Sequence, residues 1–220
     1  MDYFTKPSLL EKIANLTGLN NKFHKFQKDN INLDKSIFIS PVEAEIKYVG
    51  KIIEGRLISK NNKIVSLKEL IEDSKNFFIN GFYINLYLSP KNKHYWRIPY
   101  DSEVISTKIN KGITKFPIIV GLENLFPKLD LFDKLIQKNA SIGSIFKTQK
   151  FIYSMIAVGS LNVNGVHTIN KNYFKKGEIG GYFNIGSSML LCFQEYPFNI
   201  LKNIGDKINI GDSLLKIKDN

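Results

Sequence analysis

The chain has 220 residues, of which 43% are hydrophobic, and its 31 basic and 20 acidic residues give a net charge of +11. This length is enough for one full domain, or two small and closely packed ones, with a sizeable core. The basic excess predicts a polyanionic partner, either nucleic acid or an anionic membrane surface; a lysine-rich solvated surface is the plainer alternative. Because the lysines are dispersed and no RNA-recognition signature occurs, no nucleic acid partner is expected.

The only cysteine, Cys192, excludes a disulfide within the chain, a multi-cysteine zinc site and a CxxC motif. Its apolar neighbours predict that it is buried. With three scattered histidines, no metal is expected. No run of 18 apolar residues and no signal-peptide pattern occur, so the sequence predicts a protein that neither spans a membrane nor is secreted. We expect a cytoplasmic protein that lies peripheral to the membrane.

Residues 1–36 are predicted to form an N-terminal helical segment. Residues 7–19 have the pattern of a short amphipathic helix, with apolar residues at helical spacing, Pro7 in the first turn and Gly18 at the stop. Phenylalanines interleave with lysines around it, a pattern that suits a helix lying among lipid headgroups. The alternative is a helix that packs on its own domain.

Residues 37–220 are predicted to form a mainly β domain with few helices. Ser66 and Glu69 form a capping box that predicts a helix over 67–73, and a second short helix is expected at 128–137. Alternating or short apolar runs predict strands at 43–48, 52–59, 83–88, 103–109, 142–146, 152–158 and 188–193.

Two segments share a pattern of proline, acid, small residue, glutamate and β-branched residue, namely 41–46 and 99–104. This echo suggests a duplicated β architecture. Residues 204–214 resemble the turn and strand pairs of biotinyl and lipoyl carriers, which are small barrel-sandwich folds. No lysine occupies a Met-Lys carrier turn, so a swinging-arm carrier is rejected.

Four blocks resemble phosphatidylserine decarboxylases, in that family's order. Residues 176–193 read KGEIGGYFNIGSSMLLCF and resemble the segment that ends in Gly-Ser-Thr; residues 87–99 read YLSPKNKHYWRIP and resemble YLSPxDYHRxHxP. Residues 40–46 resemble SPVDGxI, and residues 65–71 resemble YSLExLL. The resemblance implies the duplicated barrel-sandwich fold, decarboxylation of phosphatidylserine to phosphatidylethanolamine or of a related amino acid-bearing substrate, and an anionic phospholipid membrane as partner. A homodimer is left open.

The resemblance implies that the chain cleaves itself between Gly186 and Ser187, giving chains 1–186 and 187–220. The Ser187 hydroxyl would attack the Gly186 carbonyl, and the resulting ester would eliminate to dehydroalanine, whose hydrolysis leaves a pyruvoyl cofactor. A carbonyl that condenses with the substrate amine supplies the electron sink that decarboxylation needs. A residue without Cβ at position 186 eases the strained backbone of such an attack.

Two residues depart from the family's self-cleavage machinery. In the family a histidine, oriented by an aspartate, deprotonates the serine; the matching positions here are Arg97 and Glu43. Arginine cannot accept a proton, and we expect it to form a salt bridge with Glu43. Three alternatives stay open: Glu43 acts as the base, backbone strain and a water activate Ser187, or the chain stays uncleaved as a non-catalytic homologue that binds lipid or a partner protein.

His94 matches the family's first histidine, which the resemblance makes the proton donor after carbon dioxide leaves. The alternative is a surface histidine in a polar loop. The family's Asn-Glu-Arg segment reads Asn139-Ala140-Ser141 here, which removes an acid and a base near the expected pocket. This departure leaves the substrate less certain than the chemistry.

Overall fold

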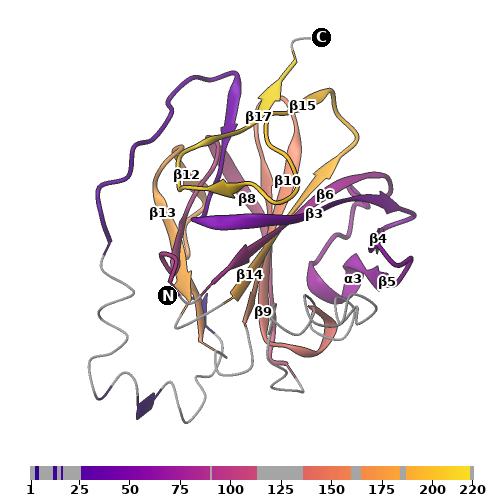
Figure 1. Cartoon of the computed structure of the whole chain (residues 1–220). Coiled ribbons are helices and arrows are strands. Elements are labelled where there is room, and N and C mark those ends of the chain that lie inside the picture. Colours follow the sequence, from indigo (N-terminus) through magenta and orange to yellow (C-terminus); the bar gives the residue numbers. More distant parts are fainter. Residues whose placement is uncertain are drawn as a thin grey trace.

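The computed structural model describes residues 3–4, 12–13, 16, 26–89, 91–112, 136–159, 165–183 and 187–218 (Figure 1). Its elements are β1 (Tyr3–Phe4), β2 (Ile37–Ile39), β3 (Ala44–Ile53), β4 (Arg56–Ile58), β5 (Ile64–Ser66), α3 (Leu67–Leu70), β6 (Gly81–Leu88), β7 (Tyr95–Arg97), β8 (Ser102–Asn110), β9 (Ser141–Lys147), β10 (Ile152–Gly159), β11 (Val166–Thr168), β12 (Tyr173–Phe174), β13 (Ile179–Phe183), β14 (Ser187–Gln194), β15 (Phe198–Ile200), β16 (Lys207–Ile208) and β17 (Ser213–Ile217). The expectation of a mainly β fold with few helices is confirmed.

A curled ten-stranded antiparallel sheet forms the centre of the molecule. Its order is β12-β8-β9-β10-β14-β6-β3-β4-β5, with β16 paired to β3. Alternate residues of β14 enter two different hydrophobic clusters: Met189, Leu191 and Phe193 on one face, and Leu190 and Cys192 on the other. Burial on both faces explains why this strand is a continuous apolar run rather than an alternating one. Cys192 is buried, as predicted.

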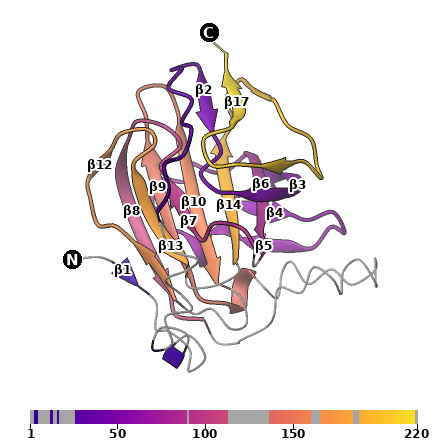
Figure 2. The same cartoon turned by 60° about the vertical axis from the view of Figure 1, so that its left-hand side comes forward.

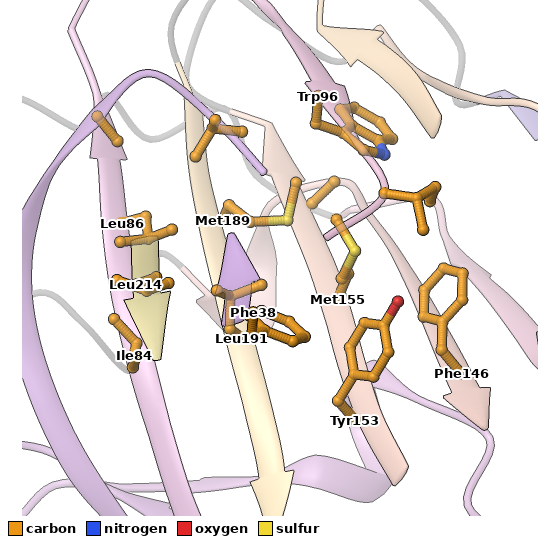
Figure 3. Packing of buried hydrophobic residues seen from close by; sticks show 14 of the residues in the cluster. Phe38, Ile84, Leu86, Trp96, Phe146, Tyr153, Met155, Met189, Leu191 and Leu214 are labelled. Atoms are coloured by element: carbon orange, nitrogen blue, oxygen red, sulfur yellow. The ribbon is translucent and has the colours of Figure 1, made fainter. Parts of the chain in front are cut away.

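The larger cluster lies between the central sheet and two smaller sheets, which have the orders β1-β11-β13-β7 and β15-β17-β2 (Figure 2). Figure 3 shows Met155 of β10 beside Met189 and Leu191 of β14, with Trp96 of β7 facing them. A Cβ at Gly181 would lie 2.2 Å from the Trp96 ring, so only glycine lets β13 approach the indole this closely. Burial of these large side chains is the main source of stability.

The helix after Ser66 is shorter than predicted. α3 ends at Leu70 instead of residue 73, and the Ser66 side chain makes no cap hydrogen bond, so the capping box is wrong. The Asp73 carboxylate instead accepts hydrogen bonds from the backbone N–H groups of Phe77 and Phe78, at 2.9 and 3.1 Å. Asp73 therefore organises the following turn, a use of the carboxylate that competes with helix propagation.

The single strand predicted at 52–59 is a hairpin. β3 and β4 turn back on each other, with Ile53 opposite Arg56. The two turn residues, Glu54 and Gly55, have φ angles of 50° and 71°. Two consecutive positive φ values make a tight two-residue turn whose twist matches the strands, and the glycine provides one of them without steric cost.

Within the part of the chain that the structure describes, no helix is long and apolar enough to cross a membrane. The N-terminal helix expected over 7–19 and the helix expected over 128–137 fall largely outside the described residues. Residues 12, 13, 16 and 136–138 are helical where they are described. The division into segments 1–36 and 37–220 stays a prediction.

Candidate active site

The end of the central sheet where β14 begins brings together segments that are far apart in the sequence. Ser187 lies opposite Leu88 at the end of β6 and opposite Gly159 at the end of β10. Six residues after Leu88, the carbonyl of His94 accepts a hydrogen bond from the backbone N–H of Phe183, at 2.7 Å. Because Leu88 pairs with Ser187 and His94 with Phe183, His94 lies toward the Ser187 end of the sheet.

Gly186 and the side chain of Ser187 lie outside the described residues, so the cleavage site is fixed only by its flanking strands. Ser187 is the first residue of β14, and its backbone pairs on both sides. Three residues separate the end of β13 at Phe183 from the start of β14 at Ser187, and the two strands belong to different sheets: β13 to the four-stranded sheet and β14 to the central one. The predicted cleavage site thus lies directly before the first residue of β14.

His94 is completely buried, which rules out the alternative of a surface histidine. Burial lowers the pKa of its imidazole to about 4, although a hydrogen bond with the backbone of Asn92 favours the charged form. The ring is therefore neutral at physiological pH. A neutral imidazole can donate a hydrogen bond from one nitrogen and accept one at the other, which suits a group that exchanges a proton with a reacting atom.

Glu43 reaches the same end of the sheet through Asn92. The Asn92 side-chain amide donates to the Glu43 carboxylate at 2.8 Å, and its carbonyl oxygen accepts bonds from the backbone N–H and the hydroxyl of Ser89, each at 2.8 Å. This network fixes the turn that leads into His94. Glu43 is half-buried and is attached to that turn rather than to Arg97.

The expected salt bridge between Glu43 and Arg97 is wrong. The Arg97 Nε instead donates to Asp29 at 2.6 Å, and its two terminal nitrogens donate to the carbonyls of Gly177 and Gln27, at 2.8 and 3.0 Å. Successive side chains of a strand point to opposite faces, so Arg97 faces away from the side that holds Trp96 and His94. The guanidinium therefore binds its partners on the outer face of β7.

Asp29 was missed by sequence reasoning, yet it is one of the most highly coordinated side chains described. Its carboxylate, only 2% exposed, accepts bonds from Lys93 at 2.7 Å, Tyr95 at 2.9 Å and Arg97 at 2.6 Å. These donors occupy alternate positions of one extended segment and so share a face. Burial would raise the pKa of Asp29, but the bonds from Lys93, Arg97 and Tyr95 outweigh it and hold that pKa below its ordinary value.

Asn139 also belongs to this end of the sheet. It is 2% exposed, and its side-chain amide donates to the carbonyl of Gly159 at 3.0 Å, while the Gly159 N–H donates to the carbonyl of Ala140 at 2.8 Å. Gly159 is the residue opposite Ser187 on β10. The segment that matches the family's Asn-Glu-Arg motif therefore anchors the end of β10 that lies opposite Ser187.

Groups suited to a metal ion do not gather here. Over the described residues, no three His, Cys, Asp or Glu side chains lie close enough to hold one. Burial raises the pKa of the Cys192 thiol, which keeps it protonated in the core. The polar groups brought together by the described strands are His94, Glu43, Asn92, Ser89 and Asn139.

The chain is similar to one protein family over nearly its whole length. The family described as phosphatidylserine decarboxylase matches residues 19–216. A phosphatidylserine decarboxylase proenzyme of Francisella philomiragia subsp. philomiragia is 31% identical over 230 residues, which cover 93% of this chain and 77% of the relative. Proenzymes of the same name from Campylobacter jejuni and Legionella pneumophila are 28% and 27% identical, covering 80% and 81% of this chain and 74% and 70% of the relatives.

Proposed function

Because the chain belongs to the phosphatidylserine decarboxylase family, we propose that it decarboxylates phosphatidylserine, or a related amino acid-bearing substrate, after cleaving itself between Gly186 and Ser187. Two backbone contacts support this proposal most directly: Leu88 pairs with Ser187, and the carbonyl of His94 accepts the N–H of Phe183. They bring the proposed proton donor and the proposed nucleophile to one end of the sheet.

The position of Ser187 suits a residue that becomes a new chain end. After cleavage, residues 188–194 would remain hydrogen-bonded to β10 and β6, and their apolar side chains would stay in both core clusters. The fragment 187–220 would therefore stay in place without a covalent link. A pyruvoyl group at residue 187 would supply the carbonyl that takes up the electron pair left by carbon dioxide.

His94 would supply the proton that replaces carbon dioxide. Its low pKa means that the resting imidazole is neutral, so it needs a nearby negative charge to become protonated. The carboxylate or phosphate of a bound substrate would supply that charge and raise the pKa. His94 would thus be able to deliver a proton only when substrate occupies the site, and it would stay neutral in the empty enzyme.

For self-cleavage, Glu43 is the remaining carboxylate at the expected triad positions. It is linked to the 89–94 segment through Asn92, which supports a role in orienting that segment or in accepting the Ser187 proton. Arg97 cannot replace a base, since it stays charged and its guanidinium is bound to Asp29.

The engagement of Arg97 favours a second candidate, an uncleaved and non-catalytic homologue that binds lipid or a partner protein. With Arg97 in an ion pair on the outer face, the position of the family's base carries no proton acceptor. Slow or absent cleavage would follow from the lack of a base.

Intact-mass measurement separates the two candidates. We expect fragments 1–186 and 187–220 that co-purify, the smaller one blocked to N-terminal sequencing. Ser187→Ala should give one uncut chain of 25.2 kDa. Ser188→Ala is the matched control and should still cleave. A single uncut chain in the native protein would favour the non-catalytic homologue, and cleavage that persists in Ser187→Ala would contradict the assignment of the nucleophile.

We also propose that the protein works in the cytoplasm, peripheral to an anionic membrane. The net charge of +11 supports this, as do the exposed apolar side chains of Ile13, Leu16, Phe26 and Leu33 along the N-terminal segment. Binding to vesicles should require anionic lipid, weaken with salt and weaken further when residues 1–25 are deleted. If the protein bound neutral vesicles and salt did not change that binding, the proposal of an electrostatic contribution would be contradicted. Tighter binding to nucleic acid than to any vesicle would contradict the proposal that the partner is a membrane.

A further inference from the structure

A cavity of about 700 Å³ opens between three segments at one side of the central sheet. The segments are the chain before β2, the start of β8 with the β9–β10 turn, and the loop around β12. This volume lies within the range of small-molecule sites. Its lining includes four lysines and two tyrosines, Lys35, Lys147, Lys175, Lys176, Tyr100 and Tyr173.

The cavity is remote from the candidate active site. Strand β10 runs from Ile152, next to the turn that lines the cavity, to Gly159, which lies opposite Ser187. Seven residues of extended chain separate these ends, or about 23 Å at about 3.3 Å per residue. A ligand of the cavity would therefore not touch His94 or Ser187.

Lys176 lies at the inner wall of the cavity. Its ammonium donates to the backbone carbonyls of Asp34 and Ile37, each at 2.7 Å, and lies 5.9 Å from the centre of the Tyr100 ring. Burial lowers the pKa of Lys176 to about 8, against the opposing attraction of Asp34 and Asp101. A half-buried ammonium held mainly by neutral carbonyls is incompletely stabilised, and an anion beside it would restore the missing interaction.

The other lysines add positive charge to the lining, and carboxylates lie near two of them: Glu178 interacts electrostatically with Lys175, and Glu103 lies opposite Lys147 in the sheet. Among the described residues, none of the ion pairs involves Lys35, Lys147, Lys175 or Lys176. Two acids also line the cavity: Asp101, whose carboxylate accepts the backbone N–H of Lys176 at 2.7 Å, and Glu103. The four ammonium groups outnumber the two carboxylates, so the cavity attracts anions overall.

We propose that this cavity is a second ligand site and that it binds a phosphate group, carried by either a soluble phosphate ester or a lipid headgroup. Several lysines along one cavity suit the dense charge and many acceptor oxygens of phosphate. Tyr173, 49% exposed at the rim, offers a ring face to the organic part of such a ligand. The site is independent of self-cleavage, so it should persist in Ser187→Ala.

Calorimetric titration of the full chain with inorganic phosphate tests the proposal. We expect saturable binding at one site in both the native protein and Ser187→Ala. Lys147→Gln and Lys175→Gln should each weaken binding about tenfold, because each removes a charged hydrogen bond. These lysines are exposed, so their loss should not affect folding, whereas Lys176 ties down the chain before β2. Lys60→Gln, an exposed lysine away from the cavity, is the matched control and should bind normally.

Vesicles of phosphatidylcholine with and without phosphatidic acid distinguish the two sources of phosphate. Loss of binding to phosphatidic acid vesicles in the Lys147→Gln, Lys175→Gln double variant would support a lipid headgroup. Unchanged vesicle binding with lost phosphate binding would support a soluble ester. An absence of saturable phosphate binding, or equal weakening by Lys60→Gln, would overturn the proposal in favour of diffuse surface charge.

Discussion

A buried titratable group lies at each face of the segment 93–97, and the two groups differ in charge: His94 is neutral and Asp29 is ionised. His94, on the inner face, is neutral because burial lowers its pKa and the hydrogen bond with the backbone of Asn92 does not compensate. Asp29, packed on the outer face, stays ionised because three donors surround its carboxylate. Burial alone therefore does not decide the charge of a group; the number of partners that its charged form finds does.

The two faces therefore have different roles: the inner face holds a candidate catalytic group, and the outer face holds a structural ion pair. The inner face keeps a neutral imidazole, which we propose gains a proton when a charged substrate binds. The outer face keeps a fixed ion pair that holds residues 27–29 against β7. The arginine at the expected position of the family's base belongs to the second face, so its charge stabilises the fold rather than assisting proton transfer.

Removal of the Asp29 carboxylate should have the largest effect. Asp29→Ala leaves Lys93 and Arg97 without their partner in a partly buried setting, so we expect the free energy of unfolding to fall by about 3–4 kcal/mol. Urea denaturation measures this. Glu45→Ala, which removes the more exposed pair between Glu45 and Lys47, is the control and should cost less than about 1 kcal/mol. Equal losses would mean that the outer-face network has no special role.

The neutral state of His94 should make stability depend on pH. Its pKa falls from 6.5 to about 4 on folding, so the folded chain binds fewer protons between these values. The contribution is fully present above pH 6.5 and is lost as pH falls towards 4, amounting to about 2–3 kcal/mol. Unfolding free energies measured across this range should decline in the native protein.

Two variants distinguish His94 from other groups in that range. His94→Gln carries no titratable group, so its decline between pH 6.5 and 4 should be smaller. Asp29→Asn should keep the native slope over most of this range, because the pKa of Asp29 lies below pH 4 in both states, at 3.8 when unfolded and lower when folded. A slope that His94→Gln does not change would show that the imidazole is not held neutral by burial.

The smallest effect concerns a single donor of the outer face. Tyr95→Phe removes the hydroxyl that donates to Asp29 and that accepts a long bond from the backbone N–H of Gln27, at 3.3 Å. We expect a loss of about 1–2 kcal/mol, mainly from the hydrogen bond to the charged group. The Phe26 ring that packs edge-on against Tyr95 should keep its contact. Thermal unfolding would detect the change, and a loss as large as that of Asp29→Ala would mean that ring packing, not the carboxylate, dominates this face.

The main strands could be read from the sequence because their apolar patterns are local. The runs that predicted β6, β8, β9, β10 and β14 lie within one or two residues of the observed strands. Where two conformations were locally acceptable, the reading was wrong. The apolar pattern predicts continuous strand through Glu54 and Gly55, where the chain turns, and the spacing of Ser66 and Glu69 predicts a capping box, although the Ser66 side chain makes no cap hydrogen bond.

The sequence by itself determined the family, the mainly β class, the burial of Cys192 and the candidate roles of Ser187 and His94. Each of these rests on a motif or an apolar pattern, and both are local properties that can be read directly from the sequence. The tertiary structure alone decided that Arg97 pairs with Asp29, 68 residues away, and that Glu43 reaches Asn92, 49 residues away. Strand register and the facing of alternate side chains set these contacts. Neither is specified by the local sequence, since each depends on which distant segment packs against the strand.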